Sequence, residues 1–414
     1  MRNPIELSTK NSMISVRDAL KRVLSHCPGV RPVSMELHLA LGLVLAEDVM
    51  SDIDMPPFRK AMMDGYAVQS PDCSQENALL DVVGVVPAGV MATFRIATGQ
   101  AAKIMTGAPM PAGADAVQMV EKTRAENDKV RIIEPVRSGQ HIASRGEIMK
   151  KGEKVIAAGM AIDGAVSGLL ASVGYAKVLV CPPPSVAILV TGDELVDVAQ
   201  KPAGSEIRNS NSHALCAQVQ MAGAKPVYLG IARDSKGELA ARIAEGLQYD
   251  ILLVSGGVSM GDFDFVEDIF ADAGVTMHFD SVNIKPGKPT VFGTKENKLI
   301  FGLPGNPVSA STVFEIIVRP ALRKLMGFGR TEHFKVEARL TKPYTNRSRR
   351  ETYHPALTTL EDQVWRTSPV VSKGSADVVA FARSNSYIVT RAERGVYEKD
   401  DLVEVVLRDP FWDH

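Results

Sequence analysis

The spacing of apolar residues divides the chain into regions of different character. Over 15–48, apolar residues recur every three or four positions, which predicts two short helices. Over about 79–156, short β-branched runs alternate with glycine and proline turns, which indicates a small all-β unit. A helical pattern at 161–178 follows, and it ends just before Pro182–Pro184, which predicts a stiff boundary.

Beyond these prolines, strand and helix patterns alternate. The strand patterns lie at 185–193, 224–234, 249–257, 275–284 and 298–306. The helix patterns lie at 210–223, 235–248, 263–274 and 307–327. This alternation predicts a largely parallel sheet covered by helices. From about Thr331 the strand pattern returns, which predicts a C-terminal β domain.

The length of the chain requires several domains. At 414 residues it exceeds the roughly 250–300 residues at which a single core stops growing. The predicted fold class is therefore α/β plus β, in a multidomain chain. It comprises a central α/β domain with a mostly parallel sheet, a small β domain inserted near the N-terminus, and a C-terminal β domain.

Composition excludes several classes of function. Hydrophobic residues make up 45% and charged residues 23%, as in ordinary globular proteins, and the net charge of −1 argues against binding to nucleic acid. The N-terminus lacks the apolar region of a signal peptide, and no apolar run approaches the ~20 residues of a membrane span. The four cysteines have no C-x-x-C spacing, and no H-x-x-x-H suggests zinc. A cytoplasmic protein is expected.

Polar and glycine-rich segments follow nearly every strand of the predicted sheet. Ligands bind at the carboxyl ends of the strands in open α/β sheets. These segments are Thr191–Glu194, Arg233–Asp234, Ser255–Asp264, Lys285–Lys288 and Leu303–Asn306. One such loop is weak evidence, but several loops on one edge predict a binding site.

The residue types suggest what this site binds. The backbone N–H groups that begin at Ser255 run into a helix and suit a phosphate. Lys285 and Lys288, held apart by a Pro-Gly pair, suit an oxyanion, although an isolated K-P-G is as often a solvated loop. Glu194, Asp234 and Asp264 offer oxygen ligands to Mg²⁺. Asp234 and Asp264 also fit helix N-capping, whereas Glu194 has no such structural role.

Two residues of the β unit are weaker candidates. Asp64 stands beside a glycine in MMDGYA, and Thr106 stands in a tight turn in KIMTGAPMP. From the residues alone, a turn role is the more economical interpretation of each.

Several distinctive segments occur together in a fixed order. They read MDGYA, IMTGAPMPAGADAV, SGQHIASRGE, TGDEL, SGGVSMGDFD, IKPGKP and GLPGNPVSA. In this the chain resembles molybdopterin molybdenumtransferases, the molybdate insertase family of bacterial MoeA and the gephyrin E domain. The resemblance extends from about Ser15 to Leu407, and the combination of GGVSMG, KPGKP and GLPGNPVS is highly specific.

The resemblance implies a reaction and an assembly. Adenylylated molybdopterin and molybdate would be the substrates, Mg²⁺ the cofactor and AMP a product, with molybdenum left on the pterin dithiolene. It implies an elongated homodimer whose cleft lies between the α/β domain of one subunit and the β domain of the other. A molybdopterin adenylyltransferase and acceptor molybdoenzymes are possible further partners. The implied domains are 1–48 with 149–183 as one discontinuous unit, 49–148, 184–330 and 331–414.

The resemblance also implies roles for individual residues. Lys285 and Lys288 look like molybdate ligands, with Pro289 shaping their turn. Ser375 and Arg349 match further family residues at the oxyanion, and Arg350 is the alternative to Arg349. The residues that the resemblance further implies to be catalytic are Asp64, Thr106, Glu194, Asp234 and Asp264. Of these, Glu194, Asp234 and Asp264 would also bind the metal. The further residues implied to bind substrate are Ser255, Gly256, Gly257, Ser259, Pro304 and Asn306.

The chain departs from the family pattern near MDGYA and after RGE. Ala61 and Met62 replace serine and alanine, and Ile148 stands where the family has aspartate. Ile148 and Ala61 favour a molybdopterin carrier or scaffold as the alternative, whereas the retained Asp64, Glu194, Asp234 and Asp264 favour an insertase, which is the preferred interpretation. Related adenylyltransferases share the α/β domain but read GGTG, and a tungstate-preferring insertase would look the same as a molybdate insertase.

Overall fold

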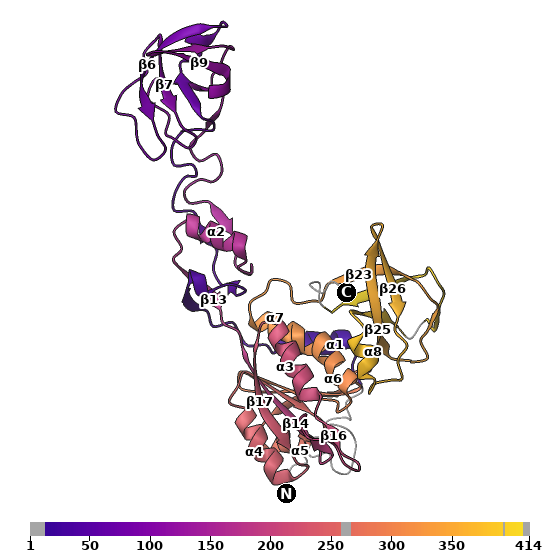
Figure 1. The fold of residues 1–414 in the computed structure, drawn as a ribbon. Coiled ribbons are helices and arrows are strands. Elements are labelled where there is room, and N and C mark those ends of the chain that lie inside the picture. Colours follow the sequence, from indigo (N-terminus) through magenta and orange to yellow (C-terminus); the bar gives the residue numbers. More distant parts are fainter. Residues whose placement is uncertain (1–12, 258–265, 392–393, 409–414) are drawn as a thin grey trace.

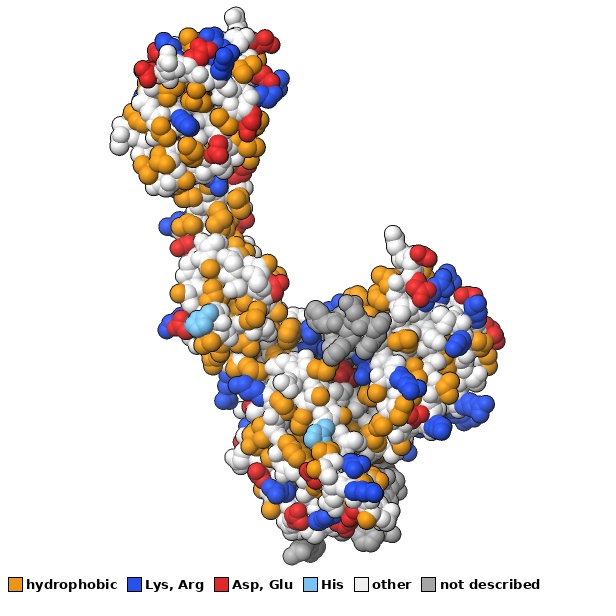
Figure 2. Space-filling model, viewed as in Figure 1, with side chains coloured by type: hydrophobic (Ala, Val, Ile, Leu, Met, Phe, Trp, Pro, Cys, Tyr) orange, Lys and Arg blue, Asp and Glu red, His pale blue; other side chains and the backbone are white. Residues whose placement is uncertain are grey.

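A computed structural model describes residues 13–257, 266–391 and 394–408. The predicted site residues Ser259 and Asp264 lie outside these ranges. The molecule is elongated, with a β domain at one end, a narrow connecting region, and an α/β domain beside a C-terminal β domain at the other end (Figures 1 and 2). No helix among the described residues is long and apolar enough to cross a membrane.

The distal β domain contains the small all-β unit that the sequence predicts. Its main sheet has the strand order β8-β5-β7-β6-β10-β9. The strands are β5 (Gly65–Val68), β6 (Ala78–Val86), β7 (Gln100–Ile104), β8 (Ala116–Met119), β9 (Thr123–Glu126) and β10 (Lys129–Ile132). The short pair β4 (Lys60–Ala61) and β11 (Ile142–Ala143) packs beside it, and two 3-10 turns lie at Ser70–Cys73 and Val120–Lys122.

The connecting region is built from two distant stretches of sequence. Strand β13 (Lys177–Cys181) lies between β1 (Val33–Glu36) and β2 (Val44–Leu45), and β12 (Lys154–Ile156) pairs with β3 (Val49–Met50). Helix α2 (Gly164–Ser172) covers them, with its N-terminus capped by Asp163. The chain therefore leaves for the β domain and returns through the same small unit.

One sequence prediction is wrong in this region. The second helix expected before residue 48 is replaced by β1, a 3-10 turn (Leu37–Leu39), β2 and β3. Leu39 and Leu41 fit a helical repeat, yet they are 62% and 71% exposed at a turn. The antiparallel pairing with β13 outweighs this local periodicity.

The first helix, α1 (Val16–Ser25), is present as predicted and is capped by Ser15. It packs against α7 (Arg319–Leu325), and its Val16, Ala19 and Val23 belong to the core of the α/β domain. The helix therefore extends the α/β domain rather than the connecting region.

The α/β domain has the mostly parallel sheet that the sequence predicts, in the order β17-β14-β18-β22-β21-β19. The first four strands are parallel, β21 runs antiparallel to β22, and β19 runs antiparallel to β21 and so in the direction of the first four. The strands are β14 (Ser185–Thr191), β17 (Lys225–Ala232), β18 (Ile251–Ser255), β19 (Thr276–Ser281), β21 (Pro289–Lys295) and β22 (Lys298–Leu303). A small parallel pair, β15 (Leu195–Val196) and β16 (Ile207–Arg208), lies at its edge.

Helices cover both faces of this sheet. They are α3 (Asn211–Met221), α4 (Lys236–Gly246), α5 (Val266–Asp272), α6 (Pro307–Val313) and α7, with a π-helical segment (Phe314–Val318) between the last two. Two separate hydrophobic clusters, one on each face, bury nearly every apolar side chain of β14 and β18. This burial explains why the parallel strands read as continuous apolar runs.

The C-terminal domain is the predicted β domain, and it borrows a strand from the α/β domain. Its sheet runs β20-β25-β26-β23-β29-β27. These strands are β20 (Ile284–Lys285), β23 (Lys335–Leu340), β25 (Glu351–Glu361), β26 (Val364–Pro369), β27 (Ser386–Thr390) and β29 (Leu402–Leu407). The pair β24 (Tyr344–Thr345) and β28 (Val396–Tyr397) and helix α8 (Val378–Ala382) complete it.

Candidate functional site

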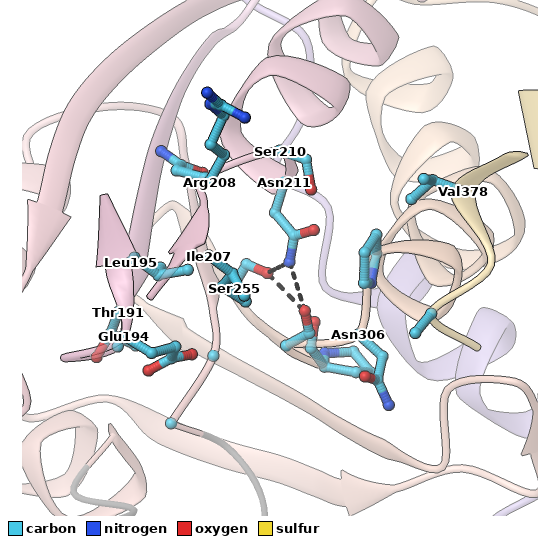
Figure 3. A pocket seen from close by; sticks show the side chains of 18 of the residues that line it. Thr191, Glu194, Leu195, Ile207, Arg208, Ser210, Asn211, Ser255, Asn306 and Val378 are labelled. Carbon is cyan, nitrogen blue, oxygen red and sulfur yellow. Dashed lines mark hydrogen bonds between the residues drawn. The ribbon is translucent and has the colours of Figure 1, made fainter. Parts of the chain in front are cut away.

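A cavity of about 640 Å³ opens at the carboxyl ends of the parallel strands (Figure 3). It lies at the edge where the sequence predicts a binding site. The predicted residues that line it are Glu194, Asp234, Ser255, Gly256, Gly257, Pro289, Pro304 and Asn306. Ala376 and Val378 of the C-terminal domain close its far side, so the cavity lies between two domains.

Asn211 ties together the loops that form the cavity floor. Its Nδ2 donates to Ser255 Oγ at 2.9 Å and to the Gly305 carbonyl at 2.7 Å, as Figure 3 shows. The Ser255 hydroxyl in turn donates to the Pro304 carbonyl at 3.2 Å. Ser255 is only 2% exposed, so its hydroxyl shapes the loop from within. Sequence reasoning missed Asn211.

The segment 208–211 contributes several cavity residues that sequence reasoning missed: Arg208, Asn209, Ser210 and Asn211. Arg208 ends β16 and the other three follow it, and because β16 lies outside the main sheet, inspection of the segments after the main strands does not find them. The polar run RNSN immediately before an apolar helix pattern was the available clue.

Gly256 is required by the backbone at the end of β18. Its φ is +101°, and a Cβ there would lie 2.4 Å from the Thr191 carbonyl oxygen. No L side chain fits this conformation or this space. The backbone of the loop can therefore approach a bound group closely.

Two carboxylates share the cavity wall. Asp234 Oδ1 accepts a hydrogen bond from the Thr191 hydroxyl, and the Asp234 N–H donates to Asp193 Oδ1 at 3.2 Å. Helix α4 has Ser235 at its N-cap without a side-chain hydrogen bond, so Asp234 faces β14 instead of capping the helix. Glu194 lines the same cavity.

These carboxylates are chemically suited to Mg²⁺, which prefers oxygen ligands and commonly keeps water and phosphate in its shell. Within the described residues, however, no group of three or more histidines, cysteines, aspartates and glutamates is close enough to hold a metal. The observed donor set is therefore a pair, Glu194 and Asp234.

A second cavity of about 430 Å³ adjoins the first, because Pro289, Pro304 and Asn306 line both. Its walls carry Lys285, Lys288, Arg350 and Ser375, and no carboxylate is among its lining residues in the described chain. We call it the oxyanion cavity. The structure thus brings both predicted lysines to one concave, basic surface.

The turn Lys285–Lys288, which we call the lysine turn, is anchored by a strand on each side. Lys285 belongs to β20, where it pairs with Thr352 of the C-terminal sheet. After Lys288, the chain continues directly as β21 of the α/β sheet, a strand that the sequence analysis did not predict. The Thr290 hydroxyl donates to the Gly287 carbonyl at 2.6 Å and closes the turn.

Gly287→Ala should destabilise this turn. Gly287 has a φ of +115°, and its Cβ would lie 2.4 Å from Val313 Cγ2 in the core. The strain and overlap should lower the free energy of unfolding by about 2–3 kcal/mol. Urea unfolding checks this, with Gly29→Ala as the control because nothing lies within 4 Å of its Cβ position. Equal stability of the two variants would contradict the close packing at Gly287.

Ser375 and Asn306 close the oxyanion cavity on the side of the C-terminal domain. Asn306 Nδ2 donates to Ser375 Oγ at 3.0 Å, and the Val308 N–H donates to the Ser375 carbonyl at 3.1 Å. This contact joins two predicted site residues across the domain boundary.

The structure distinguishes the two candidate arginines. Arg350 lines the oxyanion cavity and donates from Nη1 to the Ile284 carbonyl at 3.0 Å, one residue before Lys285. Arg349 is exposed and is not among the residues that line either cavity. Arg350 is therefore the arginine positioned beside the lysine turn.

Asp64 and Thr106 form a pair in the distal β domain. Asp64 Oδ1 accepts from the Thr106 N–H at 2.7 Å and from its hydroxyl at 3.0 Å. The backbone N–H of Thr106 lowers the pKa of the Asp64 carboxyl, with its hydroxyl as a further cause. The pair lies in the β domain, at the opposite end of the molecule from both cavities (Figure 1). The structure therefore joins these two residues to each other and not to the rest of the predicted site.

Two departures from the family pattern, Ala61 and Met62, lie just before Asp64 in the chain, and the third, Ile148, follows β11 and donates its N–H to the Met55 carbonyl at 2.8 Å. Ala61 is fully buried in the core of the β domain, where β4 pairs with β11. Met62 is 51% exposed, and Ile148 is 68% exposed beyond the end of β11. The replacement at Ala61 thus changes a core position, whereas Ile148 presents an apolar side chain to solvent.

Comparisons with known proteins match the chain along nearly its whole length. Residues 14–174 match the MoeA N-terminal region (domain I and II), 187–324 match a probable molybdopterin binding domain, and 337–407 match the MoeA C-terminal region (domain IV).

Relatives and solved structures agree with these matches. Molybdopterin molybdenumtransferases of Staphylococcus epidermidis, Nostoc sp. and Bacillus subtilis are 32%, 35% and 34% identical. The alignments cover 97%, 93% and 96% of this chain and 97%, 92% and 95% of those proteins. The crystal structure of a molybdopterin biosynthesis MoeA protein from Pyrococcus horikoshii is 30% identical, with a TM-score of 0.84 over 97% of this chain and 100% of that one.

These matches extend over the distal β domain, the α/β domain with its two cavities, and the C-terminal domain alike. The chain belongs to the molybdopterin molybdenumtransferase family, and it is a transferase of molybdenum cofactor biosynthesis.

Proposed function

We propose that this transferase inserts molybdate into adenylylated molybdopterin in a Mg²⁺-dependent reaction that releases AMP. The observation that carries the proposal is the pair of adjoining cavities. One presents glycine-rich backbone and carboxylates, the other presents lysines and an arginine, and both share Pro289, Pro304 and Asn306. A nucleotide-linked pterin and a small dianion need surfaces of these two kinds in contact.

The larger cavity suits the phosphate groups of the pterin substrate. The loop after β18 approaches closely because Gly256 has no side chain, and Asn211 fixes its position. Mg²⁺, if bound here, would be held by Glu194 and Asp234, and it would offset the negative charge of the phosphates. Thr191 orients the Asp234 carboxylate by donating to one of its oxygens.

The oxyanion cavity suits molybdate. Lys285, Lys288 and Arg350 supply positive charge, and the Ser375 hydroxyl supplies a further polar group. Because no carboxylate of the described chain lines this cavity, no negatively charged side chain there repels a dianion. Molybdate would then lie next to the pterin in the adjoining cavity.

A homodimer is part of the proposal. Asp64 and Thr106 are joined by two hydrogen bonds yet lie in the domain farthest from the cavities of their own chain (Figure 1). A partner subunit whose β domain reaches the α/β domain would bring this pair to the substrates. Molybdopterin adenylyltransferase as supplier, molybdoenzymes as acceptors and a cytoplasmic location complete the proposed setting.

A second candidate function is a molybdopterin carrier that binds without turnover. Ile148 favours it, because an exposed isoleucine can neither bind metal nor transfer a proton. Glu194, Asp234 and the Asp64–Thr106 pair favour the insertase, since a carrier has no use for them.

Single-turnover AMP release separates these functions. The unmodified chain, given adenylylated molybdopterin and Mg²⁺, should release AMP only when molybdate is present. Ile148→Asp should release it at least as fast, and Leu41→Asp is the control because Leu41 is equally exposed but lies in the connecting region. Release by the Ile148→Asp variant alone would instead identify a carrier, and release without molybdate would contradict the coupling.

A further inference from the structure

A histidine lies in the wall of the oxyanion cavity among lysine and arginine side chains. His354 lies in β25, two residues after Thr352, which pairs with Lys285. Alternate residues of a strand lie on the same face, so His354 and Thr352 lie on the same face of β25. His354 lines the cavity together with Lys285, Lys288 and Arg350.

The protein fixes the tautomer of this ring. His354 Nε2 lies 2.9 Å from the Val370 carbonyl oxygen, and a carbonyl can only accept. The proton of the neutral ring is therefore on Nε2, and Nδ1 carries a lone pair. The ring also packs against Tyr344, at 4.8 Å between centroids.

The surroundings keep the imidazole neutral near pH 7. Burial lowers the pKa of His354, the nearby charge of Lys285 lowers it further, and the hydrogen bond to Val370 opposes both. The charged or titratable groups around it are Lys285 of β20, Lys288 of the lysine turn, Arg350 before β25, Tyr353 of β25 and Tyr344 of β24. A lowered pKa means that the lone pair on Nδ1 is available at neutral pH and is lost as the pH falls.

Other polar groups of the cavity cannot accept a proton at neutral pH. Ammonium and guanidinium groups have donors but no acceptor. The Tyr353 hydroxyl donates to Glu351 at 2.6 Å, and Ser375 Oγ accepts from Asn306. Among the lining residues that the structure describes, the His354 imidazole is the side chain whose neutral form carries a basic nitrogen.

We propose that His354 carries protons from the thiols of molybdopterin to the oxide that leaves molybdate. The proposal rests on the proposed insertase function. Insertion breaks two S–H bonds and one Mo–O bond, forms two Mo–S bonds, and releases one water that contains the oxide and both protons. Molybdenum stays hexavalent, so no oxidant or reductant is needed.

The imidazole makes this exchange possible without bulk water. Nδ1 accepts the first thiol proton, the resulting imidazolium donates it to an oxide, and the cycle repeats with the second thiol. Lys285 and Lys288 hold the dianion while its charge is redistributed, but they cannot take up the thiol protons.

His354→Gln tests the shuttle, since the glutamine amide can still donate to the Val370 carbonyl. We expect the dissociation constant for molybdate, measured by calorimetry with molybdate alone, to change less than about 3-fold. Molybdenum bound to the pterin after a single turnover, measured by elemental analysis of the isolated cofactor, should accumulate about 100-fold more slowly. Added imidazole should restore part of the rate, and the acid limb of the pH profile should disappear.

His38→Gln is the matched control, because His38 is exposed in the connecting region. Unchanged molybdenum loading in His354→Gln, alongside normal AMP release, would overturn the shuttle alone. Loss of molybdate binding in this variant would also overturn it, in favour of a ligand role. Failure of the unmodified chain to release AMP would overturn the insertase and the shuttle together.

Discussion

Lys285→Ala and Lys288→Ala should each weaken molybdate binding about 10- to 100-fold, because each removes a charge-assisted bond worth about 1.5–3 kcal/mol. Both side chains line the oxyanion cavity, and both are exposed outside any hydrophobic cluster. Their loss should therefore leave the unfolding midpoint unchanged. Titration calorimetry with molybdate and urea unfolding measure the two effects separately.

Lys399→Ala is the control for these lysine variants, because Lys399 is exposed in a turn of the C-terminal domain away from the cavity. Raising the salt concentration should weaken binding to the unmodified chain more than binding to either variant, since fewer charges remain to be screened. If both variants bound molybdate as tightly as the unmodified chain, the lysine turn would be only a structural loop.

Asp64→Ala and Glu194→Gln should each abolish AMP release, and a mixture of the two proteins should recover it. If the cleft is formed between subunits, a mixed dimer has one cleft with both defects and one with neither. Random exchange of subunits would then yield about a quarter of the unmodified activity. Co-expression with two affinity tags isolates the mixed dimer, whose single-turnover AMP release per dimer should be about half that of the unmodified protein because one of its two clefts is intact.

The matched control mixes Glu194→Gln with Asp234→Asn, which both lie in the larger cavity. Every mixed dimer of this pair keeps a defect in each cleft, so no recovery is expected. Recovery in the control, or none with Asp64→Ala, would contradict a cleft shared between subunits.

The sequence predicts the main elements of the α/β domain because β14 and β18 are buried on both faces and are therefore continuous apolar runs. Such runs can be recognised as strands without knowledge of their partners. The site loops are predictable for a related reason, since parallel strands place their following segments on one edge. The second N-terminal helix is a failure of the same reasoning. There, pairing with β13 decides the structure, and local periodicity carries no information about a partner 130 or more residues away in sequence.

The candidate site was predictable where residues act through their own chemistry, as at Lys285 and Glu194. It was not predictable where a residue acts by joining loops, as Asn211 does by contacting Ser255 and Gly305. Arg350 differs from Arg349 only in the direction that the chain takes before β25, which depends on the pairing with β20. His354 drew no attention because its meaning depends on Val370 and the lysine turn, which adjoin it only in the folded chain.

The position of strand β20 affects whether the C-terminal domain can be separated from the α/β domain. Its two residues belong by sequence to the α/β domain but are hydrogen-bonded into the C-terminal sheet, directly before the lysine turn. A chain cut near residue 330 would leave Lys285 without the strand that orients it. If Lys285 binds molybdate as proposed, the C-terminal domain cannot be gained or lost as an independent module while molybdate binding is kept. On this proposal, the affinity for molybdate would report whether the α/β domain and the C-terminal domain are packed together.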